Sequence, residues 1–393
     1  MGTPSEVPKR SRQQLSKGME HMRTAVTIDP IFLPKSPPLE TDAYGVPIAL
    51  EPVRNPTSRS HNPDNNQKRT DPFAFGSRLL EEGDNIFEFN AWDHVETDDA
   101  YKEFSELQYA KQREAPVSDF DKSRFNGNPA RWWNLFYANN KTNFFKNRKW
   151  LAQEFPIINE LTTPSAPPTL LLEVGAGAGN TAFPILGLNQ NPSLKIHACD
   201  FSKKAVDLIR GHENYDTKFI QADVWDVAGE ELPPGLEEGT VDVVLMIFIF
   251  SALAPSQWDQ ALRNIYRVLK PGGQVLFRDY GRGDLAQVRF KKGRYMEENF
   301  YVRGDGTRVY FFEKEELEKI WGGEKNRPAQ PVQEESQMPA FEVIHIGVDR
   351  RMLVNRQRKL KMYRCWMQAV FRKTEQQLQA TNGDNAKVNS ENQ

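Results

Sequence analysis

One stretch of this sequence constrains the fold more than any other. It is the glycine-rich turn Glu-Val-Gly-Ala-Gly-Ala-Gly-Asn at residues 173–180, which directly follows the apolar run 170–172. Glycine adopts backbone conformations that other residues avoid, so such a turn can be tight and can let a ligand approach the main chain. An apolar strand that ends in a glycine turn and leads into a helix is typical of the ligand-binding edge of a parallel sheet.

The segments after this turn alternate between strand and helix patterns. We predict a helix at 255–269, which ends at a Lys-Pro-Gly-Gly turn, and strands at 194–199, 218–221, 241–249 and 274–278. Strands that are nearly continuous in apolar residues are buried on both faces of a sheet. The alternation therefore predicts an α/β fold with a parallel sheet.

Two aspartates follow the strands next to the turn, and the glycine spacing distinguishes between cofactors. Asp200 lies 21 residues after Gly179, where a carboxylate can accept hydrogen bonds from a ribose, and Asp223 can meet an adenine edge. A nicotinamide-binding loop would read Gly-x-Gly-x-x-Gly and would bind a pyrophosphate, whereas this loop reads Gly-x-Gly-x-Gly. S-adenosylmethionine carries no phosphate and suits this loop. We therefore predict an S-adenosylmethionine-dependent methyltransferase.

The fold class that we predict is α/β, a class I Rossmann-like methyltransferase. Its mostly parallel sheet has seven strands with helices on both faces, and a helical N-terminal extension precedes it. The cofactor-binding residues that we predict from the turn and the strand ends are Glu173, Gly175, Gly177, Gly179, Asn180, Asp200, Phe201, Ser202, Asp223, Val224 and Ile247.

The sequence disfavours two kinds of methyl acceptor. Methylation of carbon 5 of a pyrimidine needs a cysteine nucleophile, and neither Cys199 nor Cys365 follows the fourth strand. Enzymes that methylate exocyclic amines usually carry an (Asp/Asn)-Pro-Pro-aromatic motif there, whereas residues 247–252 are mostly apolar. A ring nitrogen with a free lone pair needs only to be placed in line with the methyl group.

Methylation of a ring nitrogen produces a cation, which a nearby carboxylate would stabilise. Asp279, at the end of the fifth predicted strand, is our candidate for this catalytic role, together with Tyr280. The alternative is that Asp279 is a structural residue paired with Arg278 or Arg282.

The charged residues of the chain are segregated along the sequence. The formal net charge is only −2, yet residues 350–373 hold nine basic residues and no acidic one, and a second basic cluster follows the fifth strand. Residues 131–155 hold eight aromatic and five basic residues. A charge run can simply be a solvated face, and aromatic residues can simply pack on the core. Segregated basic clusters are nevertheless typical of nucleic-acid binding. Eight aromatic residues are too many for a surface patch alone, so we expect some of them to pack on the core and others to face a ligand.

Composition divides the rest of the chain. Residues 1–70 hold ten of the 26 prolines, so we predict a disordered region there and a disordered tail at 379–393. Between them we place a family-specific extension at 71–168 and a methyltransferase domain at 169–378, with a flexible insertion at 323–340. The longest apolar run, 243–250, is too short to span a bilayer, and two cysteines make no disulfide scaffold. We expect a cytoplasmic protein that binds no metal and no membrane.

Several longer motifs resemble those of a known family, the eukaryotic tRNA N3-methylcytidine methyltransferases. The resemblance covers about residues 71–373 and is carried by residues 133–137, 143–151, 198–202, 277–281 and 298–308. It implies methylation of cytidine 32 in the anticodon loop of tRNA. It also implies that the aromatic and basic segment closes over the cofactor and helps to grip the tRNA, with Trp133, Tyr137, Arg148 and Lys149 lining the cofactor pocket. Many members have histidine where this chain has Lys149.

Two further stretches look like the branch of the family that acts on threonine tRNA. They are residues 75–78 with 90–95, and residues 349–356. The serine-tRNA branch, which leans on seryl-tRNA synthetase, usually lacks the first stretch. The alternatives are the same chemistry on serine or arginine tRNA with an aminoacyl-tRNA synthetase or an adaptor protein as partner, a small-molecule or protein methyltransferase, or a catalytically silent RNA-binding protein.

For the substrate, we predict that the anticodon loop docks on the basic clusters and that the target cytidine is splayed into the pocket. Aromatic stacking on Tyr280, Phe290 or Tyr301 would offset the cost of unstacking the base. The substrate-binding residues that we predict are Arg278, Arg282, Arg289, Phe290, Tyr301, Arg303, Arg308, Arg350, Arg351 and Arg356.

Overall fold

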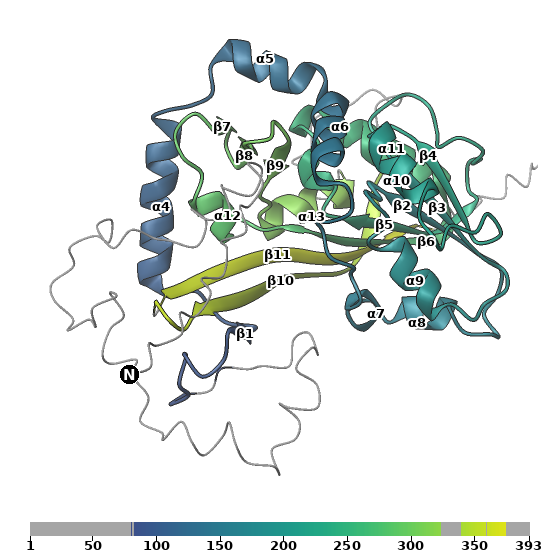
Figure 1. The fold of residues 1–393 in the computed structure, drawn as a ribbon, viewed down its shortest axis with the longest axis horizontal. Coiled ribbons are helices and arrows are strands. Elements are labelled where there is room, and N and C mark those ends of the chain that lie inside the picture. The colour runs from purple at the N-terminus through teal and green to yellow at the C-terminus, as the bar shows by residue number, and fades with distance from the viewer. Residues whose placement is uncertain (1–79, 81, 324–338, 359, 375–393) are drawn as a thin grey trace, which may run out of the picture.

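The computed structural model describes residues 80–374, except for residues 81, 324–338 and 359. The described chain forms an eight-stranded sheet in the order β1-β10-β11-β6-β5-β2-β3-β4 and a separate three-stranded sheet in the order β7-β8-β9 (Figure 1). The disordered ends that we predict at 1–70 and 379–393, and most of the insertion at 323–340, lie outside the described residues.

Five neighbouring strands of the large sheet run parallel and form the α/β part of the molecule. They are β2 (Thr169–Val174), β3 (Leu194–Asp200), β4 (Ile220–Val224), β5 (Val241–Ile247) and β6 (Leu269–Tyr280). The helices between them are α9 (Ala182–Leu188), α10 (Lys203–Arg210) and α11 (Trp258–Val268). Each predicted strand and the predicted crossover helix is present, and two 3₁₀ turns, Phe250–Ala252 and Pro255–Gln257, precede α11.

The parallel strands are buried on both faces, as their apolar runs predict. Leu172 and Val244 belong to the core cluster on the α11 side, and Leu171 and Leu245 belong to the cluster on the side of α9 and α10. Successive residues of a strand point to opposite faces, so one apolar run supplies both cores.

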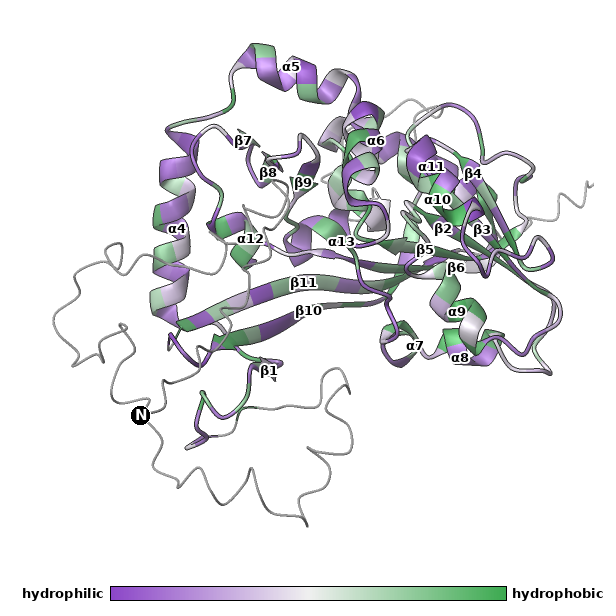
Figure 2. Cartoon of the chain, viewed as in Figure 1, coloured by the Kyte–Doolittle hydropathy of each residue, from purple (hydrophilic) through white to green (hydrophobic). Residues whose placement is uncertain are grey.

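A long antiparallel hairpin extends the sheet beyond β6. It consists of β10 (Phe341–Asn355) and β11 (Leu360–Lys373), and β11 pairs antiparallel with β6. Figure 2 shows hydrophobic and hydrophilic residues alternating along both strands, as expected for a hairpin with one face packed on the core.

The N-terminal extension supplies the eighth strand, which the sequence analysis did not predict. β1 (Ala91–Asp93) pairs antiparallel with β10. Its central residue, Trp92, is completely buried in a cluster with Met352, Val354 and Tyr363 of the hairpin. The extension that we predicted to be helical therefore begins with a strand, and helix α4 (Asp99–Arg113) begins only after Asp98, whose side chain accepts a hydrogen bond from the backbone of Tyr101.

The remaining helices and short strands precede β2 or follow β6 in the chain. In Figure 1, α4 stands beside the free end of the hairpin, and α5 and α6 lead from it towards the parallel strands. These helices are α5 (Asp119–Gly127), α6 (Pro129–Asn140), α7 (Leu151–Glu154) and α8 (Ile157–Leu161). After β6 come α12 (Leu285–Val288), β7 (Tyr295–Glu297), β8 (Phe300–Val302), β9 (Arg308–Tyr310) and α13 (Lys314–Gly322). In the part of the chain that the structure describes, no helix has the length and apolarity needed to cross a bilayer.

Candidate functional site

The glycine turn after β2 has no room for side chains. Gly175, Gly177 and Gly179 all have positive φ angles, of 67°, 61° and 80°. A Cβ atom on Gly175 would lie 2.7 Å from Cγ1 of Ile249, and one on Gly177 would lie 2.6 Å from the hydroxyl oxygen of Tyr137. Both the backbone conformation and the close neighbours therefore require glycine here.

The carboxylate of Asp200 braces this turn from the end of β3. One oxygen accepts a hydrogen bond from the backbone N–H of Gly177 at 2.8 Å, and the other accepts one from the N–H of Ser202 at 2.7 Å. Burial raises the pKa of Asp200 to about 6, and the two hydrogen bonds oppose that rise. The hydroxyl of Ser202 donates to Oδ1 of Asn134 at 2.8 Å, which ties helix α6 to the same strand end.

A cleft opens between α6 and the carboxyl ends of β2 and β3. It brings together five of the residues that we predicted to bind the cofactor: Trp133, Tyr137, Gly175, Asp200 and Phe201. The turn after β5 forms the opposite wall through Ile249 and Ala252, and the sequence analysis did not single these residues out. The other lining residues are Pro129, Val174, Trp225, Asp226, Val227, Leu253, Gln257 and Arg308.

Asp223, Val224 and Ile247 are among the predicted cofactor residues that do not line this cleft. The carboxylate of Asp223 accepts a hydrogen bond from Arg210 at 2.7 Å and lies 2.9 Å from Nε2 of His197. Its contact with adenine stays a prediction, and Asp226, three residues later, is an acidic residue of the same loop that lines the cleft. Val224 is 44% exposed and Ile247 is buried in β5, and neither residue lines the cleft.

A buried ion pair connects the glycine turn to the segment between α6 and α7. Glu173 is 1% exposed, and its carboxylate lies 3.9 Å from Nη1 of Arg148. Arg148 also donates a hydrogen bond to the hydroxyl of Thr181 at 2.7 Å. Burial raises the pKa of Glu173 to about 7, against the attraction of Arg148 and the hydrogen bonds from Thr181 and Ala182. A buried carboxylate needs a charged or hydrogen-bonding partner, and Arg148 is the cation next to it.

The rest of this segment is packed rather than aimed at the cleft. Asn180 donates from Nδ2 to Oδ1 of Asn147 at 3.1 Å, so it fastens the segment instead of lining the cleft. Lys149 is exposed, and the structure does not bring it into the cleft as we predicted. Phe136 and Tyr137 are buried, and the ring of Phe136 packs edge-on against Trp133 at 5.4 Å between centroids. The aromatic segment thus packs on the core and also lines the cleft.

The candidate catalytic pair lies at the end of β6. Asp279 is completely buried, and its carboxylate accepts backbone hydrogen bonds from Ser251 at 2.9 Å and Tyr280 at 2.8 Å. Burial raises its pKa to about 6. The alternative pairing with Arg278 or Arg282 is wrong, since both arginines have other partners. Asp279 instead fixes the turn that forms one wall of the cleft, and its catalytic role stays a prediction.

Arg278 is not a surface cation, contrary to our prediction. It is 1% exposed, and its guanidinium carbon lies 5.0 Å from the ring centroids of both Trp150 and Trp366. It is hydrogen-bonded to Asp349 and to Gln368. Arg278 therefore holds the hairpin β10–β11 against the segment before α7 and is not available to a tRNA.

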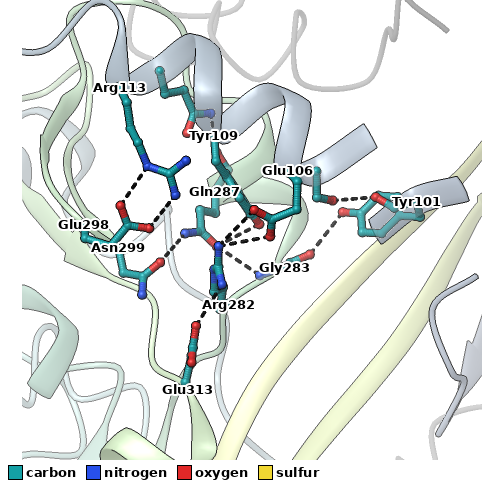
Figure 3. Close-up of polar contacts among 12 residues, drawn as sticks. Tyr101, Glu106, Tyr109, Arg113, Arg282, Gly283, Gln287, Glu298, Asn299 and Glu313 are labelled. Carbon is teal, nitrogen blue, oxygen red and sulfur yellow. Dashed lines mark hydrogen bonds and ion pairs between the residues drawn. The ribbon is translucent and has the colours of Figure 1, made fainter. Parts of the chain in front are cut away.

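Polar contacts with α4 hold two other predicted substrate residues, Arg282 and Tyr301, in place, and Figure 3 shows those of Arg282. Arg282 pairs with Glu106 of α4 at 3.0 Å and with Glu313 at 2.9 Å. Tyr301 is 1% exposed, and its hydroxyl donates to Oε1 of Gln112 at 2.9 Å. Because that ring is covered, stacking of a base on Tyr301 is ruled out in this arrangement.

Phe290 lies against the covered Tyr301 ring. The two rings are parallel within 6°, with centroids 4.8 Å apart. Phe290 itself is only half-buried, so its role as a stacking residue stays a prediction.

The remaining predicted arginines divide by their surroundings. Arg308 is 3% exposed and forms part of the cleft wall, where it donates to Asn126 and Gln257, each at 2.9 Å. Arg308 is thus a buried residue of the cleft wall, and its predicted role in substrate binding stays a prediction. Two arginines of the hairpin form ion pairs, Arg351 with Asp93 at 2.7 Å and Arg350 with Glu96 at 3.7 Å. The guanidinium carbon of Arg303 lies 5.5 Å from the ring centroid of Tyr280, and Nη2 of Arg289 lies 3.6 Å from the sulfur of Met362. Arg356 is exposed at the end of the hairpin.

Comparison with known proteins agrees with this geometry. A family model described as a methyltransferase domain matches residues 172–275. A tRNA N(3)-methylcytidine methyltransferase of Schizosaccharomyces pombe is 48% identical over 300 residues, which cover 76% of this chain and 92% of that protein. A tRNA N(3)-cytidine methyltransferase of Homo sapiens is 33% identical and is covered over 93% of its length. The chain belongs to the tRNA N(3)-methylcytidine methyltransferase family.

A third relative is more similar in sequence but longer. The tRNA(Thr) (cytosine(32)-N(3))-methyltransferase of Saccharomyces cerevisiae is 51% identical over 302 residues, which cover 76% of this chain. This chain spans only 46% of the length of that protein.

The cofactor of this methyltransferase is S-adenosylmethionine, and the residues of the cleft fit it. Gly175 in the wall of the cleft carries no Cβ atom that would fill the space next to Ile249, and a carboxylate at the end of β3 can accept hydrogen bonds from a ribose. Asp200 and Tyr137 complete the wall. Within the described ranges, no group of three or more His, Cys, Asp or Glu side chains is placed to hold a metal ion.

Proposed function

We propose that this methyltransferase converts cytidine 32 in the anticodon loop of threonine tRNA to 3-methylcytidine. The observation that carries the proposal is the similarity to a relative that acts on this tRNA, together with a cleft whose residues fit the methyl donor. The tRNA(Thr) (cytosine(32)-N(3))-methyltransferase of Saccharomyces cerevisiae is 51% identical over 302 residues of this chain. The cleft holds Trp133, Tyr137, Gly175 and Asp200 in one wall.

The residues of the chain set the conditions for transfer to a ring nitrogen. When bound, S-adenosylmethionine supplies the methyl group. Asp200 and the glycine turn fix the floor of the cleft, and helix α6 closes over it through Tyr137. No cysteine nucleophile is at hand, because Cys199 and Cys365 are both buried in strands, and burial raises the pKa of both thiols. Positioning of an acceptor with its own lone pair is the chemistry that such a site favours.

Arg303 and the half-buried Tyr280 lie next to the predicted catalytic residue Asp279. The guanidinium carbon of Arg303 is 5.5 Å from the ring centroid of Tyr280, and it lies close enough to lower the pKa of Asp279 against the effect of burial. Both residues are accessible, unlike Arg278 and Tyr301. We assign the predicted base and phosphate contacts to these accessible groups.

The test is methyl transfer from labelled S-adenosylmethionine to purified threonine and serine tRNA transcripts. Each transcript is used with cytidine 32 intact or replaced by uridine, and the labelled nucleoside is identified after digestion. We expect labelled 3-methylcytidine from threonine tRNA only when cytidine 32 is present. Transfer that persists with uridine at position 32 would contradict the assigned site, and a preference for serine tRNA would contradict the assigned branch.

A protein partner is the second variable of this experiment. If neither transcript accepts the methyl group while S-adenosylhomocysteine still binds, the assay is repeated on tRNA extracted from cells, with and without seryl-tRNA synthetase. Activity that needs the synthetase would assign the chain to serine tRNA with a partner. Activity on neither tRNA under any of these conditions would exclude the proposed reaction and would leave a small-molecule or protein acceptor.

A further inference from the structure

Phe248 stands out in the backbone at the carboxyl end of β5. It has a φ angle of 61°, and within the described residues only three other non-glycine residues, His94, Lys141 and Asn299, have a positive φ. A bulky residue in the left-handed region is under strain, and such strain persists where the surroundings hold the residue in place. Strained residues of this kind cluster at binding and catalytic sites.

The neighbouring strand holds Phe248 in this conformation. Its backbone N–H donates to the carbonyl oxygen of Arg278 at 2.7 Å, directly after the last paired residues of β5 and β6, Ile247 and Arg278. The left-handed turn ends the alternation of side chains along β5. The ring of Phe248 is half-buried, although the side chains of Ile247 and Phe250 are buried.

The ring lies beside a second accessible aromatic ring. Tyr280, at the carboxyl end of β6, has its ring centroid 5.0 Å from that of Phe248, with a tilt of 49°. These adjacent parallel strands end at the edge where open α/β sheets bind ligands. The next residue after Phe248, Ile249, lines the cofactor cleft and lies against Gly175. Two half-buried rings therefore lie at the strand ends next to the wall residue Ile249, and the ring of Phe248 also packs in part on the core cluster of α9 and α10.

The structure also shows what kind of group the Phe248 ring accepts. The guanidinium carbon of Arg148, which belongs to the segment covering the cleft, lies 5.8 Å from the centroid of this ring. A guanidinium is a planar cation, and planar cations are attracted to the faces of aromatic rings. A pyrimidine methylated on its ring nitrogen is also a planar cation.

We propose that Phe248 is a base-stacking residue and that its ring forms, with Tyr280, the platform on which the target pyrimidine lies. The inference rests on the proposed function and deepens it, because it names the group that holds the acceptor ring beside the methyl donor. Stacking on an aromatic ring needs only the π-face of the base, so this platform positions the ring and leaves the choice of base to other contacts. The same face stabilises the positive charge that the ring acquires on methylation.

The test compares Phe248→Leu with Phe248→Tyr in the full chain. Leucine retains apolar bulk but removes the π-face, whereas tyrosine retains it. We expect kcat/KM for threonine tRNA to fall about 10- to 100-fold in Phe248→Leu and to stay within about threefold of wild type in Phe248→Tyr. The affinity for S-adenosylhomocysteine and the melting temperature should stay near those of wild type in both variants.

A matched control is Tyr266→Leu. Tyr266 is also a half-buried aromatic residue, but it packs on Phe341 at the opposite end of β6, so its loss should leave kcat/KM unchanged. If Phe248→Leu is as active as wild type, the proposal is wrong. It is equally wrong if the activity of this variant falls in parallel with its melting temperature or with its affinity for S-adenosylhomocysteine, because the ring would then be a packing residue.

A second measurement separates this inference from the proposed function. An anticodon stem-loop with pyrrolocytidine at position 32 is mixed with the protein and S-adenosylhomocysteine, and its fluorescence is recorded. Stacking on the platform should quench the fluorescence with wild type and Phe248→Tyr but not with Phe248→Leu. A wild-type protein that methylates no tRNA would overturn the proposed function, and the absence of a difference in quenching would overturn the role of Phe248.

Discussion

The two sides of this molecule differ in how their polar residues are used. At the carboxyl ends of β2 and β3, the glycines and Asp200 that mark the sequence pattern meet in one cleft. On β6 and the hairpin β10–β11, the arginines that mark an equally clear pattern are largely paired within the protein. Arg278 is enclosed by two tryptophans, and Arg351 is bound to Asp93.

The difference follows from what each kind of residue contributes. A glycine acts through its backbone, and its position in the chain fixes where that effect occurs. An arginine acts through a long side chain that can reach acids on several elements, so its function depends on which elements the fold places beside it. A basic cluster in a sequence therefore locates a charge-rich region but does not say which cations are free to bind a ligand.

The largest effect is expected on removing Arg278, which tests whether this arginine has a structural role. In Arg278→Ala, the carboxylate of Asp349 loses its buried partner, and we expect the free energy of unfolding in urea to fall by about 3–5 kcal/mol. The exposed Arg356 serves as the control, and its replacement by alanine should cost less than about 0.5 kcal/mol. A stable Arg278→Ala protein that binds tRNA weakly would restore the substrate contact that we first predicted.

A second variant tests the cofactor side. In Gly175→Ala, the new methyl group would meet Ile249 at 2.7 Å in a backbone conformation that alanine disfavours. We expect the affinity for S-adenosylhomocysteine, measured by calorimetry, to fall by about 100-fold, on the order of 2–3 kcal/mol. Gly187→Ala is the matched control, because Gly187 has no atom within 4 Å of its added Cβ and should bind normally. Equal affinities of the two variants would show that the turn is not a binding element.

The buried carboxylate of Asp279 should give the protein a specific pH dependence. Its pKa in the folded protein is about 6, above its ordinary value of 3.8, because of burial. A carboxyl whose pKa is raised by folding stabilises the protein fully below about pH 4, and this contribution is lost as the pH rises through about 6. Relative to Asp279→Asn, wild type should therefore become less stable in urea as the pH rises from about 4 to about 6.5, and should change little above that pH. A difference in stability that does not change with pH would contradict the raised pKa.

The smallest expected effect is on tRNA binding, and it compares two arginines of the hairpin. Arg356 is exposed, whereas Arg351 is paired with the buried Asp93. We expect Arg356→Ala to weaken tRNA binding a few-fold, for all tRNAs alike, and to lower the slope of affinity against salt concentration by about one. Arg351→Ala should instead lower stability and leave that slope unchanged. If Arg351→Ala lowered the salt slope and Arg356→Ala did not, Arg351 rather than Arg356 would be the arginine that contacts tRNA.

Much of the fold could be predicted because local patterns determine it. The apolar runs of β2, β3 and β5 require burial on both faces, and a glycine turn after the first of them allows little except a ligand-binding edge. The strand β1 could not be predicted in this way. It has three residues, and it forms because β10 offers a free edge to pair with, a contact between positions about 260 residues apart in the sequence.

The sequence by itself determined the class of fold, the glycine turn with Asp200, and the class of cofactor, because each depends on neighbouring residues and on backbone conformation. Only the tertiary structure decided which charged and aromatic groups face the site. It enclosed Arg278 and Tyr301, placed Asp226 in the wall of the cleft, and placed the ring of Phe248 beside Tyr280. These outcomes depend on partners that are distant in the sequence, and the energy of a long or aromatic side chain is set by those partners rather than by its own segment.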